Sequence, residues 1–158
     1  MIAYAPQVAF ILSWVFALIG WDAPGTDAAT PFDEQALRWS LYVALGWTAA
    51  VGSLMHTVFA RSTAASIGWE TSGFQYEVGF ANLAVGLAGI YAGSVDSPPA
   101  WIAASIAGGT FLALAGCYHI VEIVRDRNHA PGNTAILISD LGLPISLFAL
   151  LFTTDAIF

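Results

Sequence analysis

Five ionisable side chains lie within the apolar segments of this 158-residue chain, and their types suit proton or metal chemistry. They are His56, Glu77, His119, Glu122 and Asp140. An imidazole near neutral pH either carries a proton or binds a transition metal, and a neighbouring carboxylate can do both. Because charge inside a bilayer is costly, ionisable residues in apolar segments are functional candidates by default. We therefore take these five side chains as the candidate site.

His119 and Glu122 are three residues apart, so on a helix both project from one face. Helix-bundle metal sites combine such a doublet with carboxylates or imidazoles from neighbouring helices. We therefore expect His119, Glu122 and Glu77 to be metal ligands for iron, manganese or zinc, with Asp140 and His56 as catalytic acid–base or proton-relay groups. The alternative is structural: Glu122 is then solvated at a helix end, and His119 only satisfies a backbone carbonyl.

The composition places these residues in a membrane protein. Hydrophobic residues make up 58% of the chain and charged residues 9%, with a mean hydropathy of +0.72, which is too apolar for one soluble core. Five apolar runs are each near the roughly 20 residues that cross a bilayer: Ile2–Gly20, Arg38–Ala60, Phe74–Gly93, Ala100–Val124 and Thr134–Phe152. The prediction is an all-α bundle of five transmembrane helices in one domain, residues 1–158, or four helices if the first is a cleaved signal. We expect the first helix to be retained, because no basic residue precedes Arg38.

Alternate threading of these helices brings the five ionisable residues to one membrane face. Arg61, Arg125 and Arg127 are on that side and Arg38 is on the other, so the positive-inside rule makes it cytoplasmic. The net charge of −7 argues against nucleic acid or anionic lipid as partners. The acidic, lysine-free composition suits a high-salt habitat, and a GC-rich genome explains it equally well. We therefore expect a multi-pass cell-membrane protein whose partner is the lipid bilayer.

The third apolar run carries a stripe of small and amide residues on one helical face. Its members recur every three or four positions: Gln75, Gly79, Asn82, Gly86, Gly89 and Gly93. Such a face lets another helix approach closely, and its amides can hydrogen-bond across the contact. We expect a packing role, and a further structural role for Asn133 at the start of the last helix. The neighbour is either in the same chain or in a second copy or other membrane partner.

Three short motifs resemble a known group of sequences. They are Phe74-Gln75-Tyr76-Glu77-Val78-Gly79, then His119-Ile120, then Ala130-Pro131-Gly132-Asn133. The pattern resembles that of an uncharacterised family of small multi-pass integral membrane proteins of bacteria and archaea, over about half the chain. This chain departs from it at Gly73 and Tyr118. The resemblance implies membrane class and importance for Gln75, Glu77, His119 and Asn133, and it implies no particular chemistry.

Three functions are compatible with these patterns. The first is a metal-binding membrane enzyme that acts on a lipid-soluble substrate. The second is a small proton- or cation-coupled transporter or channel, in which the same imidazoles and carboxylates carry the ion. The third is a non-catalytic membrane subunit or assembly module that packs through the glycine stripe. The sequence does not decide among them.

Overall fold

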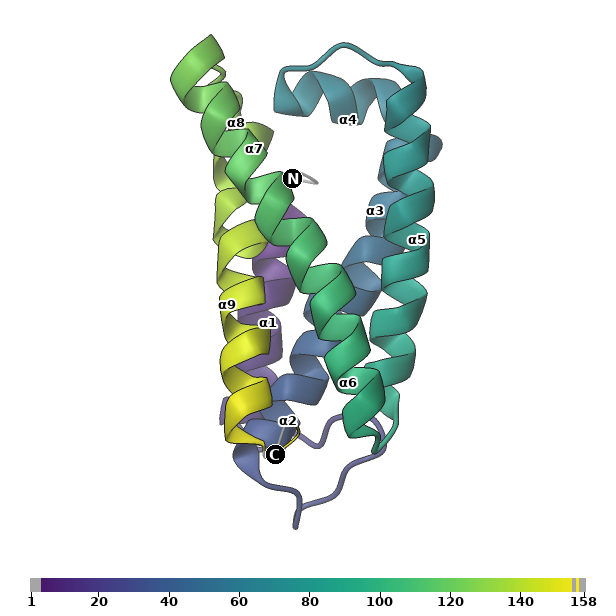
Figure 1. Cartoon of the computed structure of the whole chain (residues 1–158), viewed down its shortest axis with the longest axis vertical. Helices are drawn as coiled ribbons and strands as arrows, with labels where there is room; N and C mark the ends of the chain where they lie inside the picture. Colours follow the sequence, from purple (N-terminus) through teal and green to yellow (C-terminus); the bar gives the residue numbers. More distant parts are fainter. Residues whose placement is uncertain (1–3, 155, 157–158) are drawn as a thin grey trace.

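A computed structural model describes residues 4–154 and 156, and within them the chain is helical with no strand. Long segments run alternately up and down, and a short helix, α4, crosses one end of the bundle (Figure 1). We call this end, which also holds α8, the α4 end, and the opposite end the α2 end. In chain order the elements are α1 (Ala5–Leu18), α2 (Phe32–Trp39), η2 (Ser40–Trp47), α3 (Thr48–Thr57), α4 (Ala60–Ile67), α5 (Gly73–Ser94), α6 (Pro98–Ala104), η3 (Ser105–Gly109), α7 (Thr110–Asp126), α8 (Pro131–Ala135) and α9 (Leu137–Thr153).

Local sequence sets several of the helix ends. Gly68 ends α4 with a φ of 80°, a left-handed conformation that glycine adopts without strain. Pro131 lies in the first turn of α8, where its missing N–H costs nothing. Helix α5 begins at Gly73, one residue before the predicted apolar run, and Ser72 makes no side-chain cap. The amide of Gln75, which could have completed a capping box, instead hydrogen-bonds to a neighbouring helix.

Two of the long segments contain π-helical turns, η2 and η3, each continuous with the α-helices on either side. Pro98–Asp126 and Pro131–Thr153 are each long and apolar enough to cross a membrane. Phe32–Thr57 and Ala60–Ile67 together qualify as a third segment, although the two are bent by 103°. Helix α1 has 14 residues and so spans about 21 Å, which is short of a hydrocarbon core of roughly 30 Å. Length and apolarity together are therefore met by two or three of the five expected spans.

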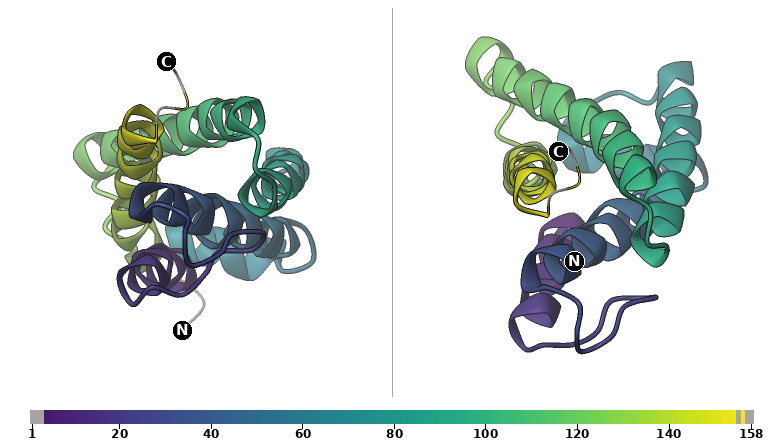
Figure 2. Two further views of the ribbon diagram at one scale, coloured as in Figure 1. Left: turned by 90° about the horizontal axis from the view of Figure 1, so that it is seen from below. Right: turned by 60° about the horizontal axis from the view of Figure 1, so that its bottom comes forward.

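Helix α5 packs on η2 and α3 of the same chain through the predicted stripe (Figures 1 and 2). All six stripe residues are buried. A methyl group added at Gly86 would lie 2.6 Å from the Ala50 backbone nitrogen, and one added at Gly89 would lie 2.9 Å from the Gly46 Cα. The opposite face of α5 exposes large apolar side chains: Phe74, Phe80, Leu83, Leu87 and Tyr91. The helix thus buries its small and polar face and exposes its apolar face.

The buried side chains separate along the bundle. A cluster of leucines with Trp101 fills the half towards the α2 end, contributed by α2, η2, α6 and the second half of α9: Leu37, Leu41, Leu45, Trp101, Leu143, Leu147, Leu150 and Leu151. The half towards the α4 end holds most of the large buried polar side chains: Gln7, Gln75, Asn82, His119, Glu122, Asn133 and Asp140. The candidate site therefore lies in the polar half.

Candidate functional site

His119, near the end of α7, forms the centre of the buried polar group. Its Nδ1 lies 2.6 Å from Oδ1 of Asn133 in α8. The Asn133 amide nitrogen donates to the backbone carbonyl of Asn128, at 2.9 Å, and to that of His119, at 3.4 Å. Because both carbonyls need a donor, this orientation of the amide leaves Oδ1 facing the imidazole, so Nδ1 must carry the proton. The Nε2 atom is therefore free to accept or hold a second proton.

Asp140 of α9 faces that second imidazole nitrogen. Its Oδ2 lies 3.9 Å from His119 Nε2, and both side chains are about nine-tenths buried. Gly116, one turn before His119, allows this approach, since a methyl group there would lie 3.1 Å from the Asp140 Cβ. The 3.9 Å separation is longer than a hydrogen bond, so a proton would pass between the imidazole and the carboxyl group only through a bridging water or after a closer approach.

Trp69, in the connection between α4 and α5, covers the other side of His119. Its ring stacks on the imidazole with centroids 5.6 Å apart and planes inclined by 21°. The indole N–H donates to Glu122 Oε2 at 3.2 Å, and Arg125 lies 3.6 Å from Oε1 of the same carboxylate. Trp69 thus joins the two members of the His119–Glu122 doublet from outside the helix, and it shields the imidazole.

His56, at the end of α3, belongs to a separate contact. Its Nδ1 lies 2.8 Å from the Nε2 amide nitrogen of Gln75 on α5. Since an amide nitrogen only donates, this His56 nitrogen is the acceptor, and its proton is on Nε2. Within the described residues, no hydrogen bond or ion pair joins His56 to His119 or Asp140. Of the two expected catalytic groups, Asp140 accompanies His119, and His56 lies on the α3–α5 pair.

The expected metal set of His119, Glu122 and Glu77 does not assemble. In the part of the chain that the structure describes, no three His, Cys, Asp or Glu side chains are placed to hold a metal ion. Glu77 is exposed, because Gln75 faces inward and two positions along a helix turn the side chain by about 200°. The remaining ligands are engaged elsewhere, His119 with Asn133 and Glu122 with Trp69. His119 and Glu122 are both buried on α7, and their role as metal ligands together with Glu77 stays a prediction.

Two residues of the site acquire roles that the sequence did not suggest. Trp69 lies outside the long apolar runs of the sequence, and it stacks on His119. Asn133 was expected to have a structural role at the start of the last helix; it is fully buried and sets the proton position on His119. The resemblance to known sequences did single out Asn133 together with His119, and this was the one sequence feature that could have indicated that the two residues act together.

A second polar centre lies at the α2 end, around Arg38. The side chain is buried, pairs with Glu34 at 3.0 Å and donates to the backbone carbonyls of Pro24 and Gly93. The guanidinium also lies 5.8 Å from the ring centroid of Trp101. Arg38 therefore ties the connection between α1 and α2 to the end of α5. Arg38 is therefore a buried structural residue and adds no exposed positive charge to the loop.

The comparison with known proteins identifies a family and gives no information about the chemistry of the site. No curated protein matches the chain, and no solved structure matches it. The model of one protein family, described as a family of unknown function, DUF6790, matches residues 3–157. This match agrees with the resemblance to an uncharacterised family and extends it over nearly the whole chain. The chain belongs to DUF6790, a family of unknown function.

Proposed function

We propose that this chain is a multi-pass integral membrane protein with five membrane-crossing segments that conducts protons through the His119–Asp140 pair. Membrane insertion is inferred from the distribution of side chains, which is the reverse of that in a soluble protein. Large apolar side chains cover the outside of α1, α5 and α7, while amides, imidazole and carboxylates are inside. A soluble bundle shows the opposite arrangement, whereas lipid favours apolar exteriors and small-residue helix contacts.

The α4 end is the cytoplasmic end in this proposal. Arg61, Arg125 and Arg127 are exposed there, in or next to short connections, where basic residues set orientation. Arg38, the remaining basic residue, is buried and paired with Glu34. The exposed arginines of the described chain are therefore all at one end. The count of arginines by sequence position was three at that end against one at the other, so the asymmetry among exposed arginines is larger.

Proton conduction rests on one observation: Asp140 faces the second nitrogen of an imidazole whose first nitrogen is held protonated by Asn133. A proton arriving at Nε2 makes an imidazolium beside a carboxylate, and its transfer to Asp140 restores the starting tautomer. Ionisable residues that face a bundle interior in this way serve as proton relays in membrane proteins. The proton enters from the α4 end, where Glu122 and its partners lie.

Three polar side chains outside the His119 group are buried without a partner. The side-chain amide of Gln7, in the polar half, and the hydroxyls of Ser40 and Ser105 have no hydrogen-bond partner within the described chain. Ser40 and Ser105 are the first residues of the two π segments. Because an unpaired buried hydroxyl is costly, such sites usually hold water.

The test is proton flux into liposomes that contain the purified protein and an internal pH dye. Under a potassium diffusion potential, we expect flux above that of empty liposomes and its loss in His119→Gln and Asp140→Asn. His129→Gln is the matched control, because His129 is exposed in the α7–α8 connection. Wild-type flux equal to that of empty liposomes would refute conduction. Equal flux in all three variants would refute the role of the pair.

A further inference from the structure

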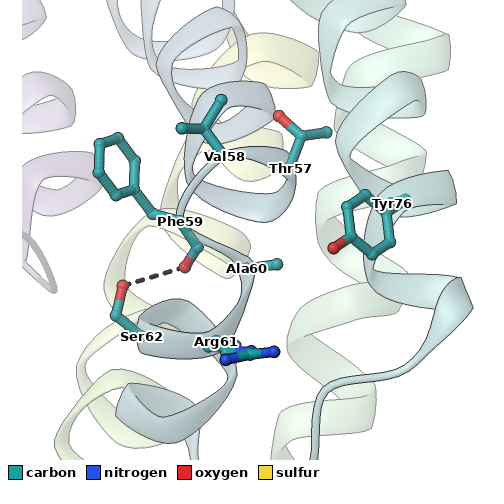
Figure 3. Close-up of a pocket in the computed structure, with 7 residues that line it drawn as sticks. All are labelled: Thr57, Val58, Phe59, Ala60, Arg61, Ser62 and Tyr76. Carbon is teal, nitrogen blue, oxygen red and sulfur yellow. Dashed lines mark hydrogen bonds between the residues drawn. The ribbon is translucent and has the colours of Figure 1, made fainter.

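We propose that the bend between α3 and α4 binds the phosphodiester headgroup of a zwitterionic phospholipid from the adjoining leaflet. This inference rests on the proposed membrane insertion and is independent of proton conduction. The bend leaves a hollow against the start of α5, at the α4 end of the bundle (Figure 3). Its lining is Thr57, Val58, Phe59, Ala60, Arg61, Ser62 and Tyr76.

Arg61 supplies the charge for such a headgroup. Its side chain is exposed and, unlike those of Arg38 and Arg125, forms no ion pair with any described residue. Figure 3 shows the Tyr76 hydroxyl, from α5, turned towards the bend that carries Arg61. A guanidinium and a phenol on two sides of one hollow are donors that suit phosphate oxygens. Neither group has a hydrogen-bond partner among the residues that the structure describes, so none would have to be given up.

The other wall of the hollow is apolar and continues onto the outside of the bundle. Val58 is 71% exposed and Phe59 is 54% exposed, although both lie at the end of a segment with the composition of a membrane span. Side chains of this kind at that position suit the first methylenes of an acyl chain below a headgroup. The polar donors would therefore lie at the level of the lipid phosphate, and the apolar strip beside them at the level of the acyl chain.

Charge around the hollow selects the class of lipid. Acidic and basic side chains are mixed at this end, where Glu70 and Glu77 are exposed together with Arg61, Arg125 and Arg127. A zwitterionic headgroup matches this mixture, because it presents a phosphate for Arg61 and a cation that tolerates the acidic neighbours. Phosphatidylethanolamine satisfies both conditions, and we take it as the probe.

Lipid retention in detergent tests this site. The protein is purified in detergent, titrated with phosphatidylethanolamine, and bound lipid is counted by native mass spectrometry. Loss of one charge-assisted contact weakens binding by roughly tenfold, so we expect that reduction in Arg61→Gln and a smaller one in Tyr76→Phe. Arg127→Gln is the matched control, because Arg127 is also an exposed arginine at the α4 end, and it should bind as the wild type does.

Three outcomes would overturn the proposal. Unchanged retention in Arg61→Gln would remove the residue on which the site depends. Equal losses in Arg61→Gln and Arg127→Gln would show a general charge effect, and displacement of the lipid by inorganic phosphate would show a site for free anions. A carbonate wash of membranes is measured in parallel, since release of the protein there would refute membrane insertion itself. Failure at the headgroup site is thereby distinguished from failure of the function proposed above.

Discussion

Replacing Gly86 with alanine tests whether the glycine stripe on α5 holds this chain together or faces a second copy. The added methyl group would lie 2.6 Å from the Ala50 nitrogen and 2.9 Å from the Gly46 carbonyl oxygen. Both are backbone atoms, so neither can rotate away as a side chain would. Ordinary contact begins at 3.4 Å, so the helices must separate by about 0.8 Å near this point.

The expected cost follows from two opposing contributions. Overpacking a close contact costs about 1–3 kcal/mol, and a clash with rigid backbone belongs at the upper end of that range. Alanine in a helix interior recovers about 1 kcal/mol relative to glycine. We therefore expect Gly86→Ala to lower the free energy of unfolding by about 2 kcal/mol. Gly73→Ala is the matched control, since a methyl group there meets no atom within 4 Å. Its unfolding midpoint should equal that of the wild type.

Unfolding is followed by circular dichroism in mixed micelles with increasing mole fraction of dodecyl sulfate, and mass is measured by light scattering. We expect a lower midpoint for Gly86→Ala with the oligomeric mass unchanged. An unaltered midpoint together with loss of an oligomer would refute packing within the chain, because the stripe would then contact another copy rather than η2 and α3.

Two further substitutions test the two polar centres. Asn133→Leu leaves the His119 Nδ1–H and a backbone carbonyl buried without partners, so we expect a loss of about 2–4 kcal/mol in the same unfolding assay; wild-type stability would show that Asn133 does not hold the imidazole. Arg38→Met strands the carboxylate of Glu34, which is 23% exposed, and should cost about 3 kcal/mol. The double variant with Glu34→Gln should recover part of that loss, and failure to recover any would contradict the ion pair as the cause.

The helices themselves were largely predictable from the sequence. Apolar length places the segments, and Gly and Pro lie at several of their ends, so α5, from Gly73 to Ser94, nearly coincides with the predicted run Phe74–Gly93. The face of α5 was also predictable, because small residues at a helical period leave only one side for close packing. The exact length of α1 was not, since apolar residues continue beyond Leu18, where the helix ends. Composition alone does not locate a helix end inside an apolar run.

The site was predictable in its residue types and not in its pairings. His119, Glu122 and Asp140 were all candidates, but which of them meet depends on how each helix is rotated about its axis. Glu77 shows the difficulty: it enters at the same end of the bundle as His119, yet its neighbour Gln75 takes the inward position. Trp69 lies outside the long helices, so no periodicity connected it with His119. Contacts between a loop and a helix are set by the tertiary fold.

The two halves of the bundle differ in their buried side chains, and this difference affects where a proton path would meet the most resistance. In the polar half, hydrogen bonds such as that between His119 and Asn133 satisfy buried side chains without bulk water. In the apolar half, leucines from η2 and α9 exclude water except at isolated hydroxyls such as that of Ser105. Resistance to protons should therefore be concentrated in the leucine cluster. A polar substitution there, Leu147→Ser, should raise flux, whereas the same change at the exposed Leu114 should leave it unaltered.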